Sequence, residues 1–563
     1  MEIVNISPVR NDVISELDAR WLACRPGSDV AIMLGLAHTL ASENLYDREF
    51  IDTYTVGFDR FLPYLLGEAD GQPKDADWAA QLSEIPADTI RQLARTLAAQ
   101  RSTISISWSL QRQEFGEQTY WMITTLGAML GDIGLPGGGV GYGYGCIHNF
   151  GFGGRKVPNY KMGALGLEIG ERKDPQANLF IPVARHADML NNPGESYRYN
   201  GQDLVYPDIK LIYWAGGNPF HHHQDLKGLS RAWAKPETII VNECFWTATA
   251  RHADIVFPCT TTMERNDVGG SSYDAYLSPM RQAVKPYQQA RHDFDVFSAL
   301  AGRLGFEERF TEGRTEMEWV EHIYAVTREN AASKGVALPD FDNFWQGEQY
   351  YVGDQLEDAE FTLERFRRDP EKYPLRTPSG KIEIFSERIA GFGYDDCQGH
   401  PRWYEHTEWL GSERANEFPL HLVSNQPKTR LHSQYDHGVT SRNHKIQERE
   451  RARMNAREAS TRNLADGDII KLFNDRGACL AGLEISEDIR DSVIELPTGA
   501  WYDPQTVDGA IIDVHGNPNA ITKDTGTSTL AQGCSAHSCL VEVEKYVGKL
   551  PEVTVFKQPA TIK

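Results

Sequence analysis

Two hydrophobic patterns alternate along the first quarter of the chain. Apolar residues recur at helical spacing over residues 30–41 and 90–98, and a third helix is expected over about 117–130. Between the second and third helices, the apolar run 103–108 predicts a buried strand. Alternation of strands and helices is typical of a parallel sheet covered by helices.

The same alternation resumes further along the chain. Short apolar strands are expected over residues 209–214, 238–241 and 253–257, and each is followed by a polar stretch rich in turn-forming residues. Because ligands of open parallel sheets bind at the carboxyl ends of the strands, these three polar ends indicate one binding crevice.

The pattern changes in the last third of the chain. Residues 307–403 are charged and aromatic, and few regular elements are expected there. After residue 415, strands expected over 420–423, 469–473 and 493–496 are separated by Asp-Gly and Arg-Gly turns. Closely spaced strands with such turns predict a separate C-terminal β-barrel.

Composition narrows the function classes. The 57 Lys and Arg residues against 79 Asp and Glu residues give a net charge of −22, which argues against nucleic acid as a partner. The uncharged apolar stretches are far shorter than a membrane span, so a soluble chain is expected. No two of the eight cysteines have CxxC spacing, which argues against zinc or iron–sulfur sites.

Two local features have open interpretations. Eleven glycines lie between Gly131 and Gly154, a density compatible equally with a flexible surface loop and with a loop facing a ligand. Residues 155–207 show little periodicity and are interpreted as an irregular excursion. The run His221-His222-His223 is not expected to bind one metal ion, because consecutive side chains point in different directions.

Polar clusters at strand ends and loops carry the candidate chemistry. They contain Arg, Asn and Asp residues, as in Ser109 to Arg112, Gly217-Asn218 and Arg265 to Asp267. A guanidinium suits phosphate, and carboxylates and amides suit purine edges. These residues indicate a large nucleotide-like ligand without identifying a reaction.

Long motifs in one order resemble a known family. The chain resembles the dimethyl sulfoxide reductase family of molybdopterin oxidoreductases, in the branch of trimethylamine N-oxide, dimethyl sulfoxide and biotin sulfoxide reductases. The matching segments are Ser42 to Asp47, Phe61 to Asp75, Gly116 to Gln118, Met129 to Gly139, Thr247 to Val256, Thr377 to Gly380, Gly516 to Asn519 and Gly526 to Ser528. The stretch from Ser42 to Asp75 favours the trimethylamine N-oxide reductases.

The resemblance implies a fold and a domain organisation. The fold class is α/β, with parallel-sheet dinucleotide-binding domains that carry helices on both faces, and a C-terminal β-barrel. The implied divisions are the C-terminal part of a molybdopterin-binding domain at 1–155, a second dinucleotide-binding domain at 156–310, a connecting region at 311–415 and a molybdopterin-dinucleotide-binding barrel at 416–563.

The resemblance also implies a cofactor and a reaction. The cofactor is bis(molybdopterin guanine dinucleotide) with one molybdenum atom. The reaction is the two-electron removal of oxygen from an N-oxide or S-oxide, with trimethylamine N-oxide favoured over dimethyl sulfoxide and biotin sulfoxide. The cofactor carries the hard chemistry, and the protein positions it.

Site residues follow from the resemblance position by position. Trp108 would wall the substrate pocket and Arg112 would supply charge near the metal, so these two are the catalytic candidates. The expected cofactor-binding residues are Ser7, Gly27, Ser28, Asp29, Trp108, Ser109, Arg112, Asn218, His222, Asn242, Glu243, Arg265, Asp293, Ser424, Asn425, Gln426, Pro427, Arg430, His432, Ser433, Gln434 and Asn519. No metal ligand is expected from this chain.

Two departures from the family pattern stand out. Ser7 occupies a strand end where the family usually has an aspartate that binds a guanosine. The chain also opens on the short strand within residues 1–8, so the family's first portion, with the serine that ligates molybdenum and any export signal, is expected to be missing.

These departures leave two hypotheses. The chain is either part of a working reductase, or a catalytically inactive cofactor-binding fragment or partner that needs a separate N-terminal chain. For the reductase, a c-type cytochrome or another electron donor is the expected partner. The full-length parent is expected in the periplasm, although this chain as written could be cytoplasmic.

Overall fold

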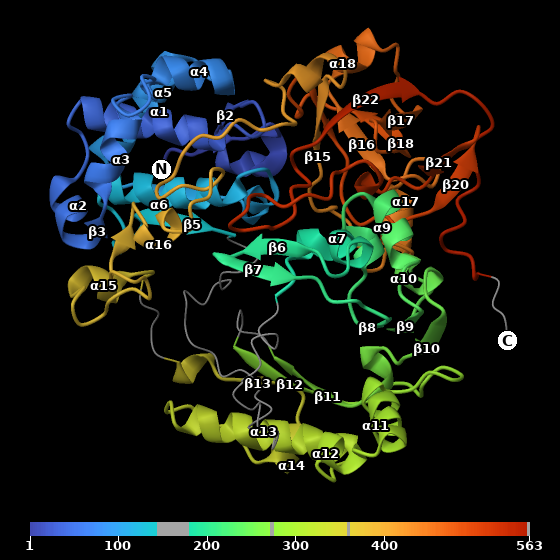
Figure 1. Cartoon of the computed structure of the whole chain (residues 1–563). Helices are drawn as coiled ribbons and strands as arrows, with labels where there is room; N and C mark the ends of the chain where they lie inside the picture. The colour runs from blue at the N-terminus through green and yellow to red at the C-terminus, as the bar shows by residue number, and fades with distance from the viewer. Residues whose placement is uncertain (144–179, 271–274, 357–360, 560–563) are drawn as a thin grey trace.

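A computed structural model describes residues 1–143, 180–270, 275–356 and 361–559, and Figure 1 shows how their elements are arranged. The N-terminal helices, drawn in blue, and the C-terminal strands, drawn in orange and red, form two bodies beside each other. A smaller green α/β layer lies beneath them, and helices α11 to α14 lie below that layer, at the bottom of the view. This arrangement confirms the predicted α/β fold with a C-terminal β-barrel.

The N-terminal part is built around helix α1 (Asp29–Ser42). Ten of its fourteen residues are buried, because α4, α5 and α6 all pack against it. Two parallel strand pairs, β1 with β2 and β4 with β5, complete this part. The remaining bounds are β1 (Val4–Ile6), β2 (Arg20–Leu22), α2 (Arg48–Tyr54), β3 (Thr55–Val56), α3 (Phe58–Leu65), α4 (Ala76–Ser83), α5 (Ala87–Ala99), β4 (Thr103–Ile106), α6 (Gly116–Leu130) and β5 (Gly139–Tyr142).

The three predicted N-terminal helices correspond to α1, α5 and α6, but the strand prediction was wrong at one end. Strand β4 stops at Ile106, and Trp108 begins the short 3-10 helix η3 (Trp108–Arg112). The Ser107 hydroxyl accepts a hydrogen bond from the Ser109 amide at 3.3 Å. A serine that caps a turn ends the strand at this point.

The second parallel sheet has the order β10-β9-β8. Its strands are β8 (Leu211–Ala215), β9 (Thr238–Glu243) and β10 (Ile255–Pro258), close to the three predicted strands. The register pairs Ala215 with Asn242 and Pro258 with Glu243, so the polar strand ends meet at one edge. The surrounding elements are α7 (His186–Asn191), β6 (Ser196–Tyr199), β7 (Gln202–Val205), α8 (Pro219–His222), α9 (Leu226–Trp233) and α10 (Ala248–Arg251). Residues 144–179, which include part of the glycine-rich segment and of the expected excursion, lie outside the described residues.

The expectation of few elements over residues 307–403 was wrong. Helix α13 (Glu316–Ala332) is 17 residues long and begins with a capping box, in which the Thr315 hydroxyl and the Glu318 carboxylate satisfy each other's backbone amides. Its buried residues include two aromatic residues and a threonine beside the aliphatic ones, so the helix has no simple apolar stripe. The neighbouring elements are β11 (Asp267–Gly270), β12 (Tyr276–Met280), α11 (Asp293–Leu304), α12 (Glu307–Thr311), α14 (Phe341–Gln346) and β13 (Tyr350–Tyr351).

The chain then returns to the N-terminal part. Strand β14 (Ile382–Glu383) pairs in parallel with β3, and the Trp121 indole donates to the Glu383 carbonyl at 2.8 Å. Two short helices, α15 (Glu364–Arg368) and α16 (Glu387–Ala390), flank this strand.

The C-terminal strands form one eight-stranded sheet of order β16-β19-β15-β22-β17-β18-β21-β20. An additional pairing of β16 with β18 closes six of the strands into the predicted barrel. The bounds are β15 (Leu420–Val423), α17 (Val439–His444), β16 (Arg451–Met454), α18 (Ala456–Thr461), β17 (Ile469–Phe473), β18 (Ala478–Ile485), β19 (Val493–Glu495), β20 (Pro504–Val507), β21 (Ala510–Asp513) and β22 (Leu540–Lys545).

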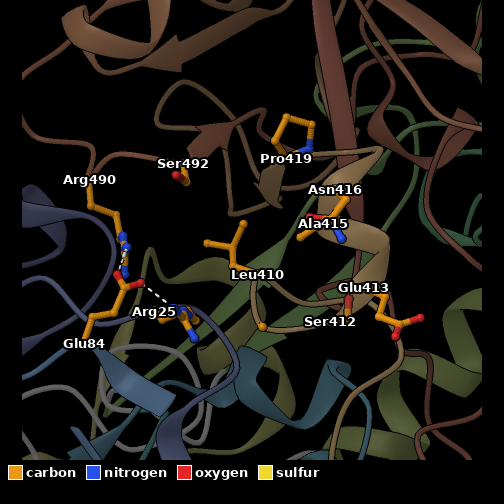
Figure 2. A pocket seen from close by; sticks show the side chains of 11 residues that line it. Arg25, Glu84, Leu410, Ser412, Glu413, Ala415, Asn416, Pro419, Arg490 and Ser492 are labelled. Atoms are coloured by element: carbon orange, nitrogen blue, oxygen red, sulfur yellow. Dashed lines mark hydrogen bonds and ion pairs between the residues drawn. The ribbon is translucent and has the colours of Figure 1, made fainter. Parts of the chain in front are cut away.

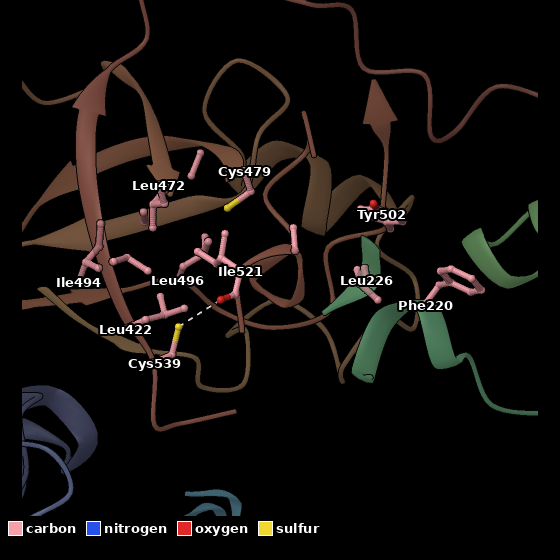
Figure 3. Packing of buried hydrophobic residues seen from close by; sticks show 14 of the residues in the cluster. Phe220, Leu226, Leu422, Leu472, Cys479, Ile494, Leu496, Tyr502, Ile521 and Cys539 are labelled. Carbon is pink, nitrogen blue, oxygen red and sulfur yellow. Dashed lines mark hydrogen bonds between the residues drawn. The ribbon is translucent and has the colours of Figure 1, made fainter. Parts of the chain in front are cut away.

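The barrel core is continuous with the core of the green α/β layer. Leu422, Leu472 and Ile494 inside the barrel belong to the same buried cluster as Phe220 and Leu226, which come from α8 and α9 (Figure 3). Burial of one shared apolar cluster fixes these two parts relative to each other. None of the described helices combines the length and apolar composition that crossing a membrane requires.

Candidate active site and cofactor-binding surface

The two residues expected to be catalytic lie on η3, immediately after β4. The Trp108 ring packs against the rings of Tyr142 and Tyr120, with centroid distances of 5.1 and 6.5 Å. The Tyr120 hydroxyl donates to the carbonyls of Ser107 and Trp108, both at 2.8 Å. Burial raises the pKa of Tyr120 to about 12, so it remains a hydrogen-bond donor. Two tyrosines that single-sequence reasoning did not select therefore fix the indole.

Arg112 ends η3 at the contact with the barrel. Its carbonyl accepts a hydrogen bond from the His537 amide at 2.8 Å, and the Glu114 amide donates to the Ser538 hydroxyl at 2.8 Å. Burial and the Arg112 charge together lower the pKa of His537 to about 4. Within the described residues, the Arg112 guanidinium has no carboxylate partner. A positive charge without a partner is available to an anionic or strongly polar ligand.

The loop that contains Gly27, Ser28 and Asp29 lies next to this segment. Gln113 donates from Nε2 to Asp29 Oδ2 at 3.3 Å. Burial raises the pKa of Asp29, and the Gln113 hydrogen bond offsets part of that rise. Gly27 has a φ of +80°, and a Cβ there would lie 3.1 Å from the His406 ring, which explains glycine at this turn.

Ser7, directly after β1, makes two hydrogen bonds with neighbouring residues. Its hydroxyl donates to Asp12 Oδ2 at 2.5 Å and accepts from the Val9 amide at 3.1 Å. Burial raises the pKa of Asp12, while Ser7 and Arg453 act to lower it. A carboxylate thus lies at this strand end although the strand itself ends in serine.

Asn242 joins several elements at the edge of the second sheet. Its Nδ2 donates to Asp293 Oδ1 at 2.8 Å, and its Oδ1 accepts from the Tyr213 hydroxyl at 2.9 Å. Asn218 accepts a short hydrogen bond from the Thr249 hydroxyl. Asn242 and Asp293 are therefore adjacent at this edge of the sheet.

Glu243 and Arg265 make hydrogen bonds and an ion pair with residues close to them in the chain. Glu243 Oε1 accepts from the Cys244 amide at 2.9 Å, and Oε2 accepts from the Thr247 hydroxyl at 3.1 Å. Arg265 lies 3.5 Å from the Asp267 carboxylate. These contacts hold Glu243 at the end of β9 and Arg265 in the loop before β11.

The barrel contributes the loop that contains the expected residues from Ser424 to Gln434. Asn425 Nδ2 donates to Glu495 Oε1 at 2.5 Å, and Gln426 Nε2 lies 2.8 Å from His432 Nδ1. The Ser433 carbonyl accepts from the Trp501 indole at 2.8 Å. Side chains of this loop therefore bind one another and the barrel wall.

Arg430 differs sharply from Arg112. Its side chain is only 1% exposed and pairs with Glu450 at 2.7 Å and Asp436 at 3.4 Å. Lys445 pairs with the same two carboxylates at 2.8 and 2.9 Å. Although burial opposes ionisation, Lys445 and Arg430 hold the pKa of Asp436 well below its usual range. Arg430 is thus a structural cation that anchors the loop.

Two contacts connect the barrel to α8. Asn519 Nδ2 donates to the His221 carbonyl at 3.0 Å. His222 lies near His432 of the barrel loop, and burial and this proximity lower the pKa of His222. The side chains of His221 and His223 are buried, and the centroids of the His222 and His223 rings lie 5.5 Å apart.

A buried ion pair, missed from the sequence, links the N-terminal part to the barrel. Lys523 Nζ lies 2.6 Å from Glu114 Oε1, and the Thr407 amide and hydroxyl each donate to Glu114 at 2.6 Å. Burial alone would raise the pKa of Glu114, but Lys523 and Thr407 together lower it. These residues are 409 positions apart, so no local pattern could have paired them.

A cavity of about 500 Å³ lies apart from these residues. Figure 2 shows Glu84 between Arg25 and Arg490, with Leu410 and Asn416 across the cavity. Glu84 lies 2.5 Å from Arg490 and is also paired with Arg25. None of the expected site residues lines this cavity.

Several groups near the expected site residues lack protein partners. Asn425 Oδ1 and Thr429 Oγ1 are buried without a hydrogen-bond partner among the described residues. A Cβ at Gly216, which follows β8, would meet no atom within 4 Å. Leu431 and Tyr435 are 58% and 69% exposed. This region thus combines polar atoms that lack partners, open space and exposed apolar side chains. Such a combination suits a large ligand with polar edges.

Comparison with known proteins shows which protein family this chain resembles. A family profile described as molybdopterin oxidoreductase matches residues 1–303, and one described as molydopterin dinucleotide binding domain matches residues 420–540. The chain is 45% identical over 549 residues to a biotin sulfoxide reductase of Cereibacter sphaeroides, covering 97% of this chain and 72% of that protein. It is 43% identical over 575 residues to a trimethylamine-N-oxide reductase of Haemophilus influenzae, covering 100% and 69%.

A solved structure supports the fold alone. The acetylene hydratase of Pelobacter acetylenicus superimposes with a TM-score of 0.66 at 18% identity, covering 97% of this chain and 74% of that chain.

The cofactor of the matching families fits the residues present. Molybdopterin guanine dinucleotide combines phosphates, a purine and a pterin. Among the described residues, the Arg112 guanidinium has no carboxylate partner and suits phosphate or oxygen, and the oxygens of Asn425 and Thr429 that lack partners there suit the donors of a heterocycle. The matches run through both the N-terminal part and the barrel. The chain therefore belongs to the molybdopterin oxidoreductase family.

Proposed function

We propose that this chain removes the oxygen atom from an N-oxide or S-oxide, with trimethylamine N-oxide as the first candidate, followed by dimethyl sulfoxide and biotin sulfoxide. The observation that carries the proposal is the Arg112 guanidinium, which has no carboxylate partner among the described residues, on the same short helix as Trp108, in a chain whose relatives are named as reductases of these compounds. When bound, the molybdenum cofactor supplies the two-electron oxo-transfer chemistry.

The chain's own residues would orient the substrate and stabilise charge. The Trp108 indole, held by Tyr120 and Tyr142, offers a flat apolar wall for the methyl groups of the substrate. The Arg112 guanidinium is placed to attract the electron-rich oxygen of an N-oxide or S-oxide. Preorganised charge of this kind lowers the barrier because it needs no reorganisation during the reaction.

Three groups of residues would hold the two dinucleotides. Ser7 with Asp12, and Gly27 to Asp29, border the first, within a domain at 1–155. Asn218, His222, Asn242, Glu243, Arg265 and Asp293 border the second, within a domain at 156–310. The loop from Ser424 to Gln434, together with Asn519 in a barrel domain at 416–563, would bracket the pterins, and 311–415 connects the parts.

Two further aspects of the proposal concern the cellular context. A c-type cytochrome is the proposed electron donor, because the reaction consumes two electrons in each turnover. The periplasm is the proposed location of the working enzyme. Reduction of the purified protein by candidate donors, followed by absorbance, tests the first point.

The names of the relatives favour this reductase over a catalytically inactive cofactor-binding fragment. The test is to purify the chain and measure molybdenum content, pterin fluorescence and viologen-coupled reduction of the three candidate substrates in parallel. We expect stoichiometric molybdenum and the highest kcat/KM with trimethylamine N-oxide. Folded protein that contains molybdenum but reduces none of the three would overturn the proposed activity.

A further inference from the structure

Two cysteines follow the ends of adjacent parallel strands. Cys244 comes directly after β9 and Cys259 directly after β10, and the register pairs the preceding residues, Glu243 and Pro258. The Cys259 amide donates to the Glu243 carbonyl at 3.3 Å, so the backbones remain adjacent one residue beyond the strands.

This geometry brings the two thiols together. Neighbouring strands lie about 4.8 Å apart, and side chains at equivalent positions point to the same face. The spacing falls within the roughly 4.4–6.8 Å between Cα atoms that a disulfide requires. Both cysteines are free thiols here, Cys244 is exposed and Cys259 is half-buried.

The two thiols are not chemically equivalent. The Cys244 thiol donates to Glu243 Oε1 at 3.5 Å. The interaction with the Cys244 thiol lowers the pKa of Cys259. The interaction with Cys259, burial and the neighbouring Glu243 carboxylate raise the pKa of Cys244. Because the thiolate is the nucleophile in disulfide exchange, Cys259 is the first to react.

We propose that Cys244 and Cys259 are a redox-active pair that a low-molecular-weight disulfide converts into an intramolecular disulfide. The Cys259 thiolate attacks one sulfur of the small disulfide, so that a mixed disulfide forms and one small thiolate leaves. Cys244, after losing its proton to solvent, attacks Cys259 Sγ and releases the second small thiol. Two protein thiols are thus oxidised while one small disulfide is reduced to two thiols.

The two cysteines lie next to residues that are expected to bind the cofactor. Asn242 and Glu243 immediately precede Cys244, and Asp293 hydrogen-bonds Asn242. A bond between residues 244 and 259 would fix the carboxyl edge of β9 and β10, where we place part of one dinucleotide. Formation of the bond itself does not depend on the proposed function.

The sequence provides a direct test. Trypsin cleaves after Arg231, Arg251 and Arg265, and so releases Cys244 in peptide 232–251 and Cys259 in peptide 252–265, each with a single cysteine. The protein is treated with oxidised glutathione, remaining thiols are alkylated, and the digest is analysed by mass spectrometry without reduction. We expect the two peptides to be joined, and dithiothreitol to separate them.

Single variants act as matched controls. In Cys259→Ser and Cys244→Ser the remaining cysteine has no resolving partner, so each should accumulate glutathione as a stable mixed disulfide. Cys534→Ala removes another partly exposed thiol and should leave the joined peptides unchanged. Wild-type protein that carries glutathione on both cysteines, or remains unmodified, without joined peptides would overturn the proposal, whatever the variants do.

Discussion

Gly499 lies directly against the backbone carbonyl of His432, so closely that any Cβ atom at position 499 would overlap that oxygen. Gly499 has a φ of +92°, and His432 itself has a φ of +49°. This contact holds the loop that contains His432, Ser433 and Gln434 against the turn after β19. The arrangement requires a residue without a side chain at 499.

The first prediction tests this contact. Gly499→Ala should destabilise the protein by about 3 kcal/mol and lower its molybdenum content, because strain at positive φ adds to overlap with the His432 loop. Gly509→Ala is the matched control: its φ is +82°, but a Cβ there meets nothing within 4 Å. This variant should lower the free energy of unfolding by only about 1 kcal/mol and leave the molybdenum content unchanged. Equal unfolding midpoints in urea for the two variants would contradict the prediction.

The second prediction concerns Arg112. Arg112→Ala should lower turnover by about 100-fold, because preorganised charge near the substrate oxygen is lost. Molybdenum content should fall much less, since the Arg112 backbone contact to His537 does not need the side chain. Parallel metal analysis and viologen-coupled assays check both quantities. If turnover and metal content fall together, Arg112 is a cofactor contact rather than a catalytic residue.

The third prediction concerns the buried pair of Glu114 and Lys523. Lys523→Met should destabilise the protein by about 3–5 kcal/mol, because it leaves the Glu114 carboxylate buried without its counter-charge. Adding Glu114→Gln should recover part of the loss. Lys471→Met breaks a more exposed pair with Glu544 and should have a much smaller effect in the same urea titration. An equal loss in Lys471→Met would argue against the role of burial.

The fourth prediction concerns pH. Burial lowers the pKa of His406 to about 4 and of His421 to about 3, from an ordinary value of 6.5. The unfolded chain therefore binds protons first, so stability is complete above pH 6.5 and is lost as pH falls toward these folded values. Between the unfolded and folded pKa values, each histidine lowers the free energy of unfolding by about 1.4 kcal/mol for each pH unit of acidification.

Urea titrations at pH 7.5 and 5.5 measure that slope. In His421→Gln, a side chain that cannot be protonated replaces the imidazole, so the fall in stability between the two pH values should be smaller than in the wild type. An unchanged difference would mean that His421 does not contribute to acid sensitivity.

Local patterns were sufficient for much of the fold. The helical spacing of apolar residues located α1 and α5, and turn residues between short apolar runs located β15 and β17. The same logic failed over α13, whose buried residues include two aromatic residues and a threonine, and at Trp108, where a capping serine ended the strand early. Both failures have local causes, and the capping box at Thr315 was visible in the sequence.

The candidate site was predictable only in part. The order of the motifs indicated which residues to examine, but not their electrostatic state. Arg112 and Arg430 are the same residue type, yet within the described part of the chain the Arg112 guanidinium has no carboxylate partner, whereas Arg430 is buried against two carboxylates. Likewise, nothing in the sequence around Ser7 indicated that Asp12 lies within hydrogen-bonding distance.

By itself, the sequence determined the class of fold, the polar strand ends and the order of the motifs that resemble the family, because these depend on periodicity and spacing along the chain. Only the tertiary structure decided which charges are paired, which histidines are neutral and which thiols meet. These properties depend on desolvation and on contacts such as that between Glu114 and Lys523, whose free energy exists only after distant segments have packed together.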